Sequence, residues 1–320
     1  MFAITAAAID TDDPLAGLRL GDHPDPVPPD GWVVVNVRAA SLNHHDLWTL
    51  KGVGVSADRL PIVLGCDASG LAPDGRPVIV HAVIGTVDGD ETLAGDFSIL
   101  SEIYDGTLAA KVAVPARNLV DMPASLSFEE ASCLPTAWLT AYRMLFTRAE
   151  LKPGQRVLVQ GAGGGVATAA LLLARAAGAH VTVTSRTADK LARASDLGAH
   201  EVVATGERLS ARVDVVVETV GAATWSHSLK ALAPGGTVVV AGATSGPNPP
   251  ADLARVFYRQ LRVVGSTMGT RTELARLVAF LDATGVRPVI DEVMPMNAAQ
   301  AAFSRLHEGD VFGKVVLTAG

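Results

Sequence analysis

The sequence is short of cysteine and of basic residues, and each shortage excludes a class of protein. Its 320 residues include two cysteines, Cys66 and Cys133, too few for a disulfide framework or a four-cysteine zinc lobe. Basic residues number 26 against 33 acidic ones, which leaves a net charge of −7. A general nucleic-acid or anionic-membrane surface needs a basic footprint, so we expect neither partner.

Long apolar runs are also missing. The richest one, VATAALLLARAAGA, is interrupted by Arg175 and is too short to span a bilayer. The N-terminal MFAITAAAID lacks a basic region and reaches Asp10, Asp12 and Asp13 too early for a signal peptide. These absences predict a soluble, cytoplasmic protein whose partner is a small molecule.

The chain is long enough for two domains with separate cores. From Arg156 onward, β-rich runs alternate with helical ones, a rhythm typical of a parallel sheet covered by helices on both faces. The expected strands are RVLVQ, HVTVTS, EVVA, VDVVVE, GTVVVAG and LRVVGS. We predict a doubly wound α/β domain over residues 122–282.

The first 120 residues have a different pattern of predicted secondary structure. Short strands such as WVVVNVRA, RPVIVHAV and LAAKVAVP are separated by Pro and Gly turns, without helix–strand alternation. This pattern favours an antiparallel, barrel-like domain. The tail repeats it in GKVVLTAG after a helix at 297–307, so we expect residues 1–121 and 283–320 to form one domain.

A glycine cluster lies between the first strand of the parallel sheet and the following helix. Gly161, Gly163, Gly164 and Gly165 allow a sharp turn and a close approach to a pyrophosphate at the helix N-terminus. A tight turn in another kind of α/β sheet is the alternative.

The next strand ends in Thr184-Ser185-Arg186-Thr187, and Lys190 follows one turn later. An NAD site wants an acidic residue here for the ribose hydroxyls, whereas a hydroxyl and two cations suit a 2′-phosphate. The cofactor is therefore predicted to be NADP(H). An ordinary solvated helix start, with Asp189 reducing the positive field, is the other interpretation.

Eight segments taken in order resemble the medium-chain dehydrogenase/reductase superfamily, in its zinc-independent, quinone-oxidoreductase-like branch. They are SLNHHDLWTLKG, LPIVLGCDASG, DGTLAAKVAVPARNLV, LPTAWLTAYRML, the loop from Ala162 to Ala167, LAPGGTVVVAG, LRVVGSTMG and GKVVL. The resemblance covers nearly the whole chain. It implies a GroES-like β-barrel catalytic domain, a Rossmann domain and an active-site cleft where they meet.

Zinc-dependent relatives carry Cys in place of Asn43 and Gly-His-Glu in place of Gly65-Cys66-Asp67. They also carry a four-cysteine lobe where this chain has no cysteine, so we predict that no metal is bound. An unusual site is the alternative, because Cys66, Asp67, His45 and Cys133 are competent ligands. A free cysteine is more commonly a small buried hydrophobe.

The resemblance also implies roles for individual residues. By position, Asn43 lies near the nicotinamide, His44 or His45 donates a proton or hydrogen bond, and Asp46 orients a neighbour. A satisfied buried histidine at position 44 and a structural cap at Asp46 remain open alternatives. The implied cofactor-binding residues are Asn43, Thr140, Gly164, Gly165, Val166, Ser185, Arg186, Lys190, Gly221, Ala241, Gly242, Ser266, Met268, Phe312 and Lys314.

Hydride delivery to a conjugated acceptor needs no Lewis acid, since charge moves onto an oxygen that a hydrogen-bond donor can stabilise. We therefore expect an NADPH-dependent reductase of quinones, enones or related carbonyl compounds. The alternatives are a zinc-type alcohol dehydrogenase with atypical ligands and a non-catalytic NADPH-binding sensor. Because LRVVGS lies at the sheet edge, a homodimer through this strand is expected.

Overall fold

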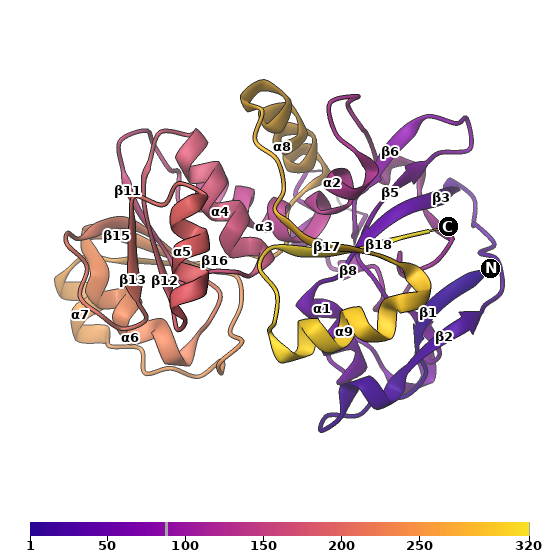
Figure 1. Cartoon of the computed structure of the whole chain (residues 1–320), viewed down its shortest axis with the longest axis horizontal. Coiled ribbons are helices and arrows are strands. Elements are labelled where there is room, and N and C mark those ends of the chain that lie inside the picture. The colour runs from indigo at the N-terminus through magenta and orange to yellow at the C-terminus, as the bar shows by residue number, and fades with distance from the viewer. Residues whose placement is uncertain (87–88, 320) are drawn as a thin grey trace. The chain divides into compact units, whose positions relative to one another are not determined.

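The computed structural model describes residues 1–86 and 89–319 and divides into two compact units (Figure 1). Unit 1 comprises Met1–Leu139 with Gly269–Gly320, and unit 2 comprises Thr140–Met268. The extents differ from those of the predicted domains, because residues 122–139 and 269–282 lie with unit 1. None of the helices in the described ranges is long and apolar enough to cross a membrane.

Unit 2 is built on six parallel strands in the order β13-β12-β11-β14-β15-β16. They are β11 (Arg156–Val159), β12 (His180–Ser185), β13 (Glu201–Ala204), β14 (Val213–Glu218), β15 (Leu232–Val240) and β16 (Arg262–Gly265). Helices α4 (Gly165–Ala176), α5 (Ala188–Asp196), α6 (Ala222–Ala231) and α7 (Leu253–Tyr258) connect them. Each predicted strand is present, so the doubly wound parallel sheet is confirmed.

The apolar strands of unit 2 hold its core. Leu158, Val183 and Val216 are at most 1% exposed, because α4 packs on β11 and β12 while α6 packs on β14 and β15. The edge strand β16 is different, since Val263 is 49% exposed. All strands run the same way, so their carboxyl ends meet at one edge of the sheet.

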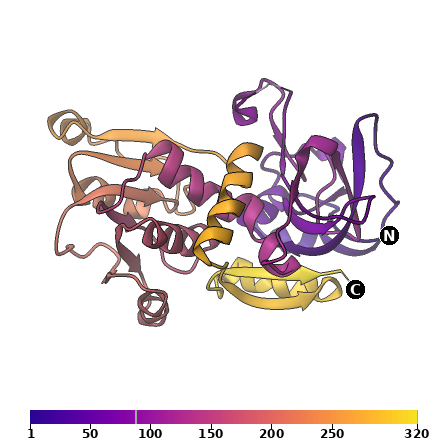
Figure 2. The same ribbon diagram turned by 90° about the horizontal axis from the view of Figure 1, so that it is seen from above.

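Unit 1 combines sheets whose strands pair antiparallel, as predicted, except that β17 (Ile290–Pro295) and β18 (Lys314–Thr318) pair in parallel. Its other strands are β1 (Phe2–Ala6), β2 (Leu18–Asp22), β3 (Trp32–Ser41), β4 (Ile62–Val63), β5 (Asp67–Leu71), β6 (Pro77–Val80), β7 (Val83–Ile84), β8 (Ser98–Ile99), β9 (Lys111–Pro115) and β10 (Leu119–Asp121). The ten-residue β3 pairs with β5, β9 and β18. The C-terminal strand thus joins the N-terminal part of the chain, and Figure 2 shows β17, β18 and α9 (Ala299–Glu308) side by side.

Three further helices belong to unit 1: α1 (His44–Leu50), α2 (Phe128–Ser132) and α8 (Arg271–Thr284). The chain between α2 and β11 continues as the π-helical turn η5 (Leu134–Trp138), α3 (Leu139–Tyr142) and the π-helical turn η6 (Arg143–Arg148). Helix α2 packs against β3 and β5, and α8 packs against β10 and η5. These contacts explain why residues 122–139 and 269–282 belong to unit 1.

The sequence analysis did not predict α8, although the signal for it is present. Thr270 caps the helix by accepting from the backbone N–H of Glu273, and the Glu273 carboxylate accepts from the backbone N–H of Thr270 at 2.7 Å. The buried Leu274 and Leu277 then give an apolar stripe. A threonine followed three residues later by a glutamate, ahead of an apolar stripe, is a helix-start signature.

Candidate functional site

The turn from β3 into α1 carries the four predicted catalytic residues. Asn43 is the N-cap of α1, and its backbone N–H donates to Asp46 Oδ2 at 2.8 Å. Asp46 Oδ1 accepts from the backbone N–H of Gly65 at 3.1 Å. Asp46 is fully buried, and burial, the largest cause, raises its pKa to about 6. These contacts make Asp46 a structural cap that ties α1 to the Gly65 turn.

A buried ammonium group lies beside Asn43. Lys314 is 3% exposed, and its Nζ donates to Leu42 O at 2.7 Å, to Asn43 Oδ1 at 2.6 Å and to Asp67 Oδ2 at 3.2 Å. Asn43 Nδ2 also donates to Asp67 Oδ2 at 2.8 Å. All three ammonium protons are therefore used inside unit 1. The sequence analysis predicts that Asn43 and Lys314 bind the cofactor. Such contacts would compete with the hydrogen bonds that these two side chains make within unit 1.

The imidazole of His45 lies between a thiol and a carboxylate. Its Nδ1 is 3.2 Å from Cys66 Sγ, and its Nε2 is 3.2 Å from Glu102 Oε1. The Cys66 thiol lies 3.3 Å from the Leu100 carbonyl oxygen. Cys66 is fully buried, and burial raises the pKa of its thiol, helped by the charges of Asp46, Asp67 and Glu102. The thiol therefore stays protonated, and both nitrogens of His45 are occupied.

His44 has a different environment from its neighbour. Its side chain is exposed at the first position of α1, and its ring makes no hydrogen bond to any residue of the described ranges. Partial desolvation lowers the pKa of His44, and the Lys314 charge lowers it further. A neutral imidazole at pH 7 follows. Of the two histidines, His44 is the one whose ring can still meet a ligand.

At two of the positions where zinc-dependent relatives differ from this chain, Asn43 and Asp67, the side chains do not fit a metal. The Lys314 ammonium is bonded to both Asn43 Oδ1 and Asp67 Oδ2, so a second cation among the same oxygens would be repelled. The third replaced position, Cys66, forms a group with His45 and Asp46 whose ligand atoms lie within 4.8 Å of one another. An ion there would replace the contact between thiol and imidazole. The absence of a metal therefore stays a prediction.

Glu102 is the residue of this cluster that the sequence analysis missed. Its Oε2 accepts from the backbone N–H of Ile99 at 2.8 Å, which aims Oε1 at His45. Because the two side chains are 57 residues apart, no local pattern relates them.

In unit 2 the glycine turn leads into α4 as predicted. Gly161 and Gly163 have φ of 80° and 103°, a left-handed backbone that favours glycine. Gly164 is the N-cap, and Gly165 and Val166 open the helix. The first amides of a helix have no partner within it, so they can bind a phosphate. A Cβ on Gly164 would meet nothing within 4 Å, which leaves room for such a group.

The other predicted cofactor residues of unit 2 follow the carboxyl ends of its strands. Ser185 ends β12, Gly221 follows β14, Ala241 and Gly242 follow β15, and Ser266 and Met268 follow β16. Arg186 lies between β12 and α5, and Lys190 lies in the first turn of α5. Ser266 Oγ is buried and lacks a hydrogen-bond partner among the described residues. An orphaned hydroxyl, an open glycine turn and the exposed Arg186 fit a dinucleotide. Thr140 opens unit 2, whereas the buried Phe312 belongs to unit 1.

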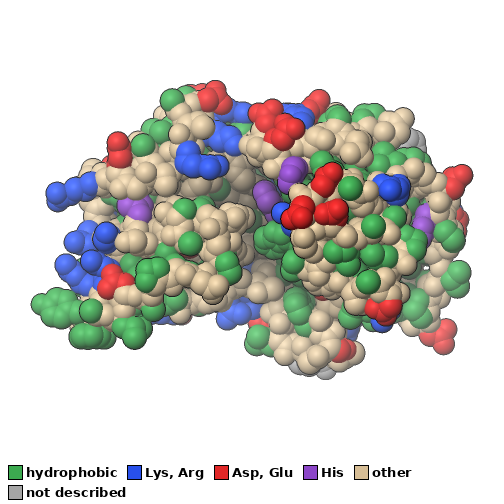
Figure 3. Space-filling view, turned by 90° about the horizontal axis from the view of Figure 1, so that it is seen from below, with side chains coloured by type: hydrophobic (Ala, Val, Ile, Leu, Met, Phe, Trp, Pro, Cys, Tyr) green, Lys and Arg blue, Asp and Glu red, His purple; other side chains and the backbone are tan. Residues whose placement is uncertain are grey.

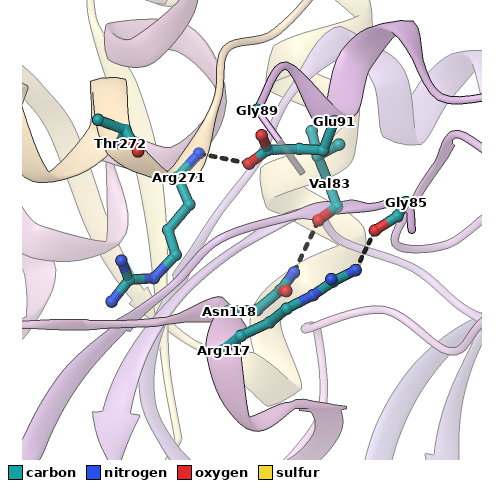
Figure 4. Close-up of a pocket in the computed structure, with 8 residues that line it drawn as sticks. All are labelled: Val83, Gly85, Gly89, Glu91, Arg117, Asn118, Arg271 and Thr272. Carbon is teal, nitrogen blue, oxygen red and sulfur yellow. Dashed lines mark hydrogen bonds between the residues drawn. The ribbon is translucent and has the colours of Figure 1, made fainter. Parts of the chain in front are cut away.

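A separate pocket in unit 1 contains none of the predicted site residues (Figure 4). Its volume is about 160 Å³, and it is lined by Val83, Gly85, Gly89, Glu91, Arg117, Asn118, Arg271 and Thr272. Glu91 Oε1 accepts from the Arg271 backbone N–H at 2.5 Å and lies 3.1 Å from His81 Nε2. The protein's own carboxylate thus occupies the place of an anion at the start of α8.

Comparisons with known proteins agree with this organisation. A family model for the alcohol dehydrogenase GroES-like domain matches residues 29–124, and one for zinc-binding dehydrogenases matches residues 165–283. A zinc-type alcohol dehydrogenase-like protein of Schizosaccharomyces pombe is 34% identical over 314 residues, covering 90% of each chain. An acryloyl-coenzyme A reductase of Metallosphaera sedula is 29% identical, covering 94% of this chain and 96% of its own.

Two solved structures share the fold. An NAD-dependent alcohol dehydrogenase superposes with a TM-score of 0.92 at 36% identity, covering 100% of both chains. A 2-octenoyl-CoA carboxylase reductase in complex with NADP and 2-octenoyl-CoA gives a TM-score of 0.92 at 25% identity, covering 99% of this chain and 87% of its own. The predicted fold class, a GroES-like domain with a Rossmann-type parallel sheet, is confirmed.

Proposed function

Because the chain belongs to the medium-chain dehydrogenase/reductase superfamily and is a nicotinamide-dependent oxidoreductase, we propose that it reduces conjugated carbonyl compounds with NADPH and without a metal. The observation that carries this proposal is the buried Lys314 ammonium, which is bonded to Asn43 and Asp67, two of the three positions where zinc-dependent relatives differ from this chain. With that place taken, reversible alcohol oxidation loses its Lewis acid.

The proposed chemistry follows from the acceptor. A bound NADPH would supply the hydride for the carbon at the end of the conjugated system; the negative charge would then collect on the carbonyl oxygen, and solvent would supply the balancing proton. His44, neutral near pH 7, is the side chain proposed to donate a hydrogen bond to that oxygen. His45, Asp46 and Asn43 support the turn, as their internal hydrogen bonds suggest.

The relatives support a conjugated acceptor and extend its class. Two of them are named as reductases of acryloyl-coenzyme A and 2-octenoyl-CoA, which are enoyl thioesters. We therefore add enoyl thioesters to quinones and enones as candidate substrates. One solved neighbour is described with NADP and another as NAD-dependent, so the preference for NADPH rests on Ser185 and Arg186.

We also propose a homodimer through the β16 edge of unit 2. On α7, next to that edge in the chain, Leu253, Phe257 and Tyr258 are 70%, 73% and 78% exposed. Hydrophobic side chains gather over this helix at the left of Figure 3. An apolar edge strand beside an apolar helix favours pairing with a second copy. A molar mass near 33 kDa in light scattering, that of one chain, would contradict the proposal.

The test follows NADPH and NADH absorbance with quinones, enones, enoyl thioesters and aldehydes, with metal content measured on the same sample. The proposal expects NADPH consumption with a conjugated acceptor and no stoichiometric zinc. Alcohol oxidation with stoichiometric zinc would favour the His45–Asp46–Cys66 group as a metal site. Tight NADPH binding without turnover on any acceptor would favour a sensor.

A further inference from the structure

A chain of buried polar side chains crosses the carboxyl ends of three strands in unit 2. Thr184 on β12, Gln160 after β11, Glu218 on β14 and Ser228 on α6 are each fully buried. Burying four polar side chains in an otherwise apolar sheet costs free energy unless every group is paired. The hydrogen-bond partners of these four side chains therefore show which parts of the backbone the row of side chains holds in place.

One end of the chain holds the glycine turn. The backbone N–H of Gly161, where that turn begins, donates to Thr184 Oγ1 at 3.3 Å. The Thr184 hydroxyl in turn donates to Gln160 Oε1 at 2.6 Å. The neighbouring backbone adds a second link, because the Ala162 N–H donates to Thr184 O at 2.7 Å.

The other end holds the turn between β14 and α6. Gln160 Nε2 donates to Ser228 Oγ at 3.0 Å, and Ser228 donates to Glu218 Oε2 at 2.5 Å. Glu218 Oε1 accepts the backbone N–H groups of Val220 at 2.8 Å and Gly221 at 3.0 Å. Gly221 has φ of 89°, and a Cβ there would lie 2.6 Å from Gly246 O, so this turn tolerates only glycine.

The hydrogen bonds run in one direction, from the Gly161 amide to the Glu218 carboxylate. A carboxylate only accepts, so it determines where the Ser228 proton points and, through Gln160, where the Thr184 proton points. The second Nε2 proton of Gln160 faces His227 Nδ1 at 2.9 Å, so each polar atom of that amide has a partner. Such a chain has a single arrangement, and its bonds strengthen one another.

We propose that Gln160 and Glu218 are positioning residues of the cofactor site, which fix the Gly161 and Gly221 turns relative to each other before the dinucleotide binds. The inference rests on the proposed cofactor site, because both turns belong to the segments assigned to the dinucleotide. Neither side chain touches the cofactor in this account. Their effect is on affinity, through preorganisation of two loops.

The test measures the Kd for NADPH and for NADH by nicotinamide fluorescence, together with kcat at saturating NADPH. Glu218→Gln can place an NH₂ group against the Ser228 hydroxyl, which already accepts a hydrogen bond from Gln160 and needs an acceptor for its own proton. Two donors then face each other, and the row of hydrogen bonds is broken at Ser228. We expect about tenfold weaker binding of both cofactors, equivalent to ~1.4 kcal/mol, with kcat unchanged within about twofold. Ser228→Ala should do the same.

Ser226→Ala is the matched control, because Ser226 lies on the same helix and is exposed. Thr184→Val keeps the side-chain shape and removes the hydroxyl at the other end of the chain. Since Thr184 and Ser228 are joined through Gln160, their combined effect on Kd should fall short of the sum of the single effects. A purely structural role would lower thermal stability without this coupling in Kd.

The outcomes separate the two proposals. If the wild type binds NADPH while Ser228→Ala and Glu218→Gln bind it as tightly as Ser226→Ala, the positioning role is wrong and the proposed function stands. If the two variants lose kcat and not affinity, the positioning role is also wrong. If the wild type binds neither cofactor, both proposals are overturned.

Discussion

The two buried polar networks, one in each unit, are built in opposite ways. Unit 2 uses neutral hydroxyls and an amide that lead to a single carboxylate, Glu218. Unit 1 packs several charged or titratable side chains together, among them Asp67, Lys314 and Asp46. In our proposal the network of unit 2 sets backbone turns for a ligand, whereas the network of unit 1 balances charge within the protein. Changes to the two networks should therefore have different consequences.

The largest expected effect is on stability, at Lys314. Lys314→Met leaves the Asp67 carboxylate buried without its cation, which should lower the free energy of unfolding by roughly 3–5 kcal/mol. Chemical denaturation measures the change. Adding Asp67→Leu to Lys314→Met removes the stranded charge and should recover most of the loss. A loss below about 1 kcal/mol in the single variant would show that Asp67 does not depend on Lys314.

The same comparison explains what could be predicted. The strands of unit 2 and the turn at Gly161 follow from local patterns, because strands, breakers and glycines lie consecutively along the chain. The Asn43–Asp67–Lys314 contact joins residues up to 271 positions apart, so only the pairing of β18 with β3 reveals it. No periodicity marks Gln160 or Glu218 either, since each looks like one polar residue at a strand end.

The second expected effect is the pH dependence contributed by Asp46. Its native pKa of about 6 lies above the ordinary value of 3.8, so the native state binds more protons than the unfolded state between these pH values. The free energy of unfolding should therefore rise as pH falls through this window, by up to about 3 kcal/mol at ~1.36 kcal/mol per pH unit.

Asp46→Asn removes this contribution. The difference in unfolding free energy between variant and wild type should change across pH 6 to 4 and be flat above pH 7. A difference that stays constant from pH 4 to pH 8 would mean that Asp46 does not titrate in this range.

The third expected effect concerns unit 2 and its preference for NADPH over NADH. Arg186→Ala removes the guanidinium proposed to bind the 2′-phosphate, so kcat/KM for NADPH should fall roughly 30-fold while that for NADH is unchanged, as expected for loss of a charge-assisted contact. Lys152→Ala changes another basic residue of unit 2, at a position without a proposed cofactor contact, and serves as control. An equal loss with both cofactors would place Arg186 outside the phosphate site.

The smallest effect concerns His44. If its neutral ring stabilises the developing oxyanion, His44→Phe should lower kcat about tenfold, a modest value for one hydrogen-bond donor, and leave the Kd for NADPH unchanged. Because its pKa is lowered, wild-type kcat should be insensitive to pH between 7 and 8 with respect to this group. An unchanged kcat in the variant would leave solvent as the only donor.

The central claim is that NADPH reduces the acceptor without help from a metal, in a protein whose buried Lys314 holds the place of a cation. Dialysis against a strong chelator, followed by elemental analysis and assay of NADPH consumption with an enone, tests it most directly. The account predicts full activity in metal-free protein. Activity that disappears with the metal and returns on addition of Zn²⁺ would contradict it.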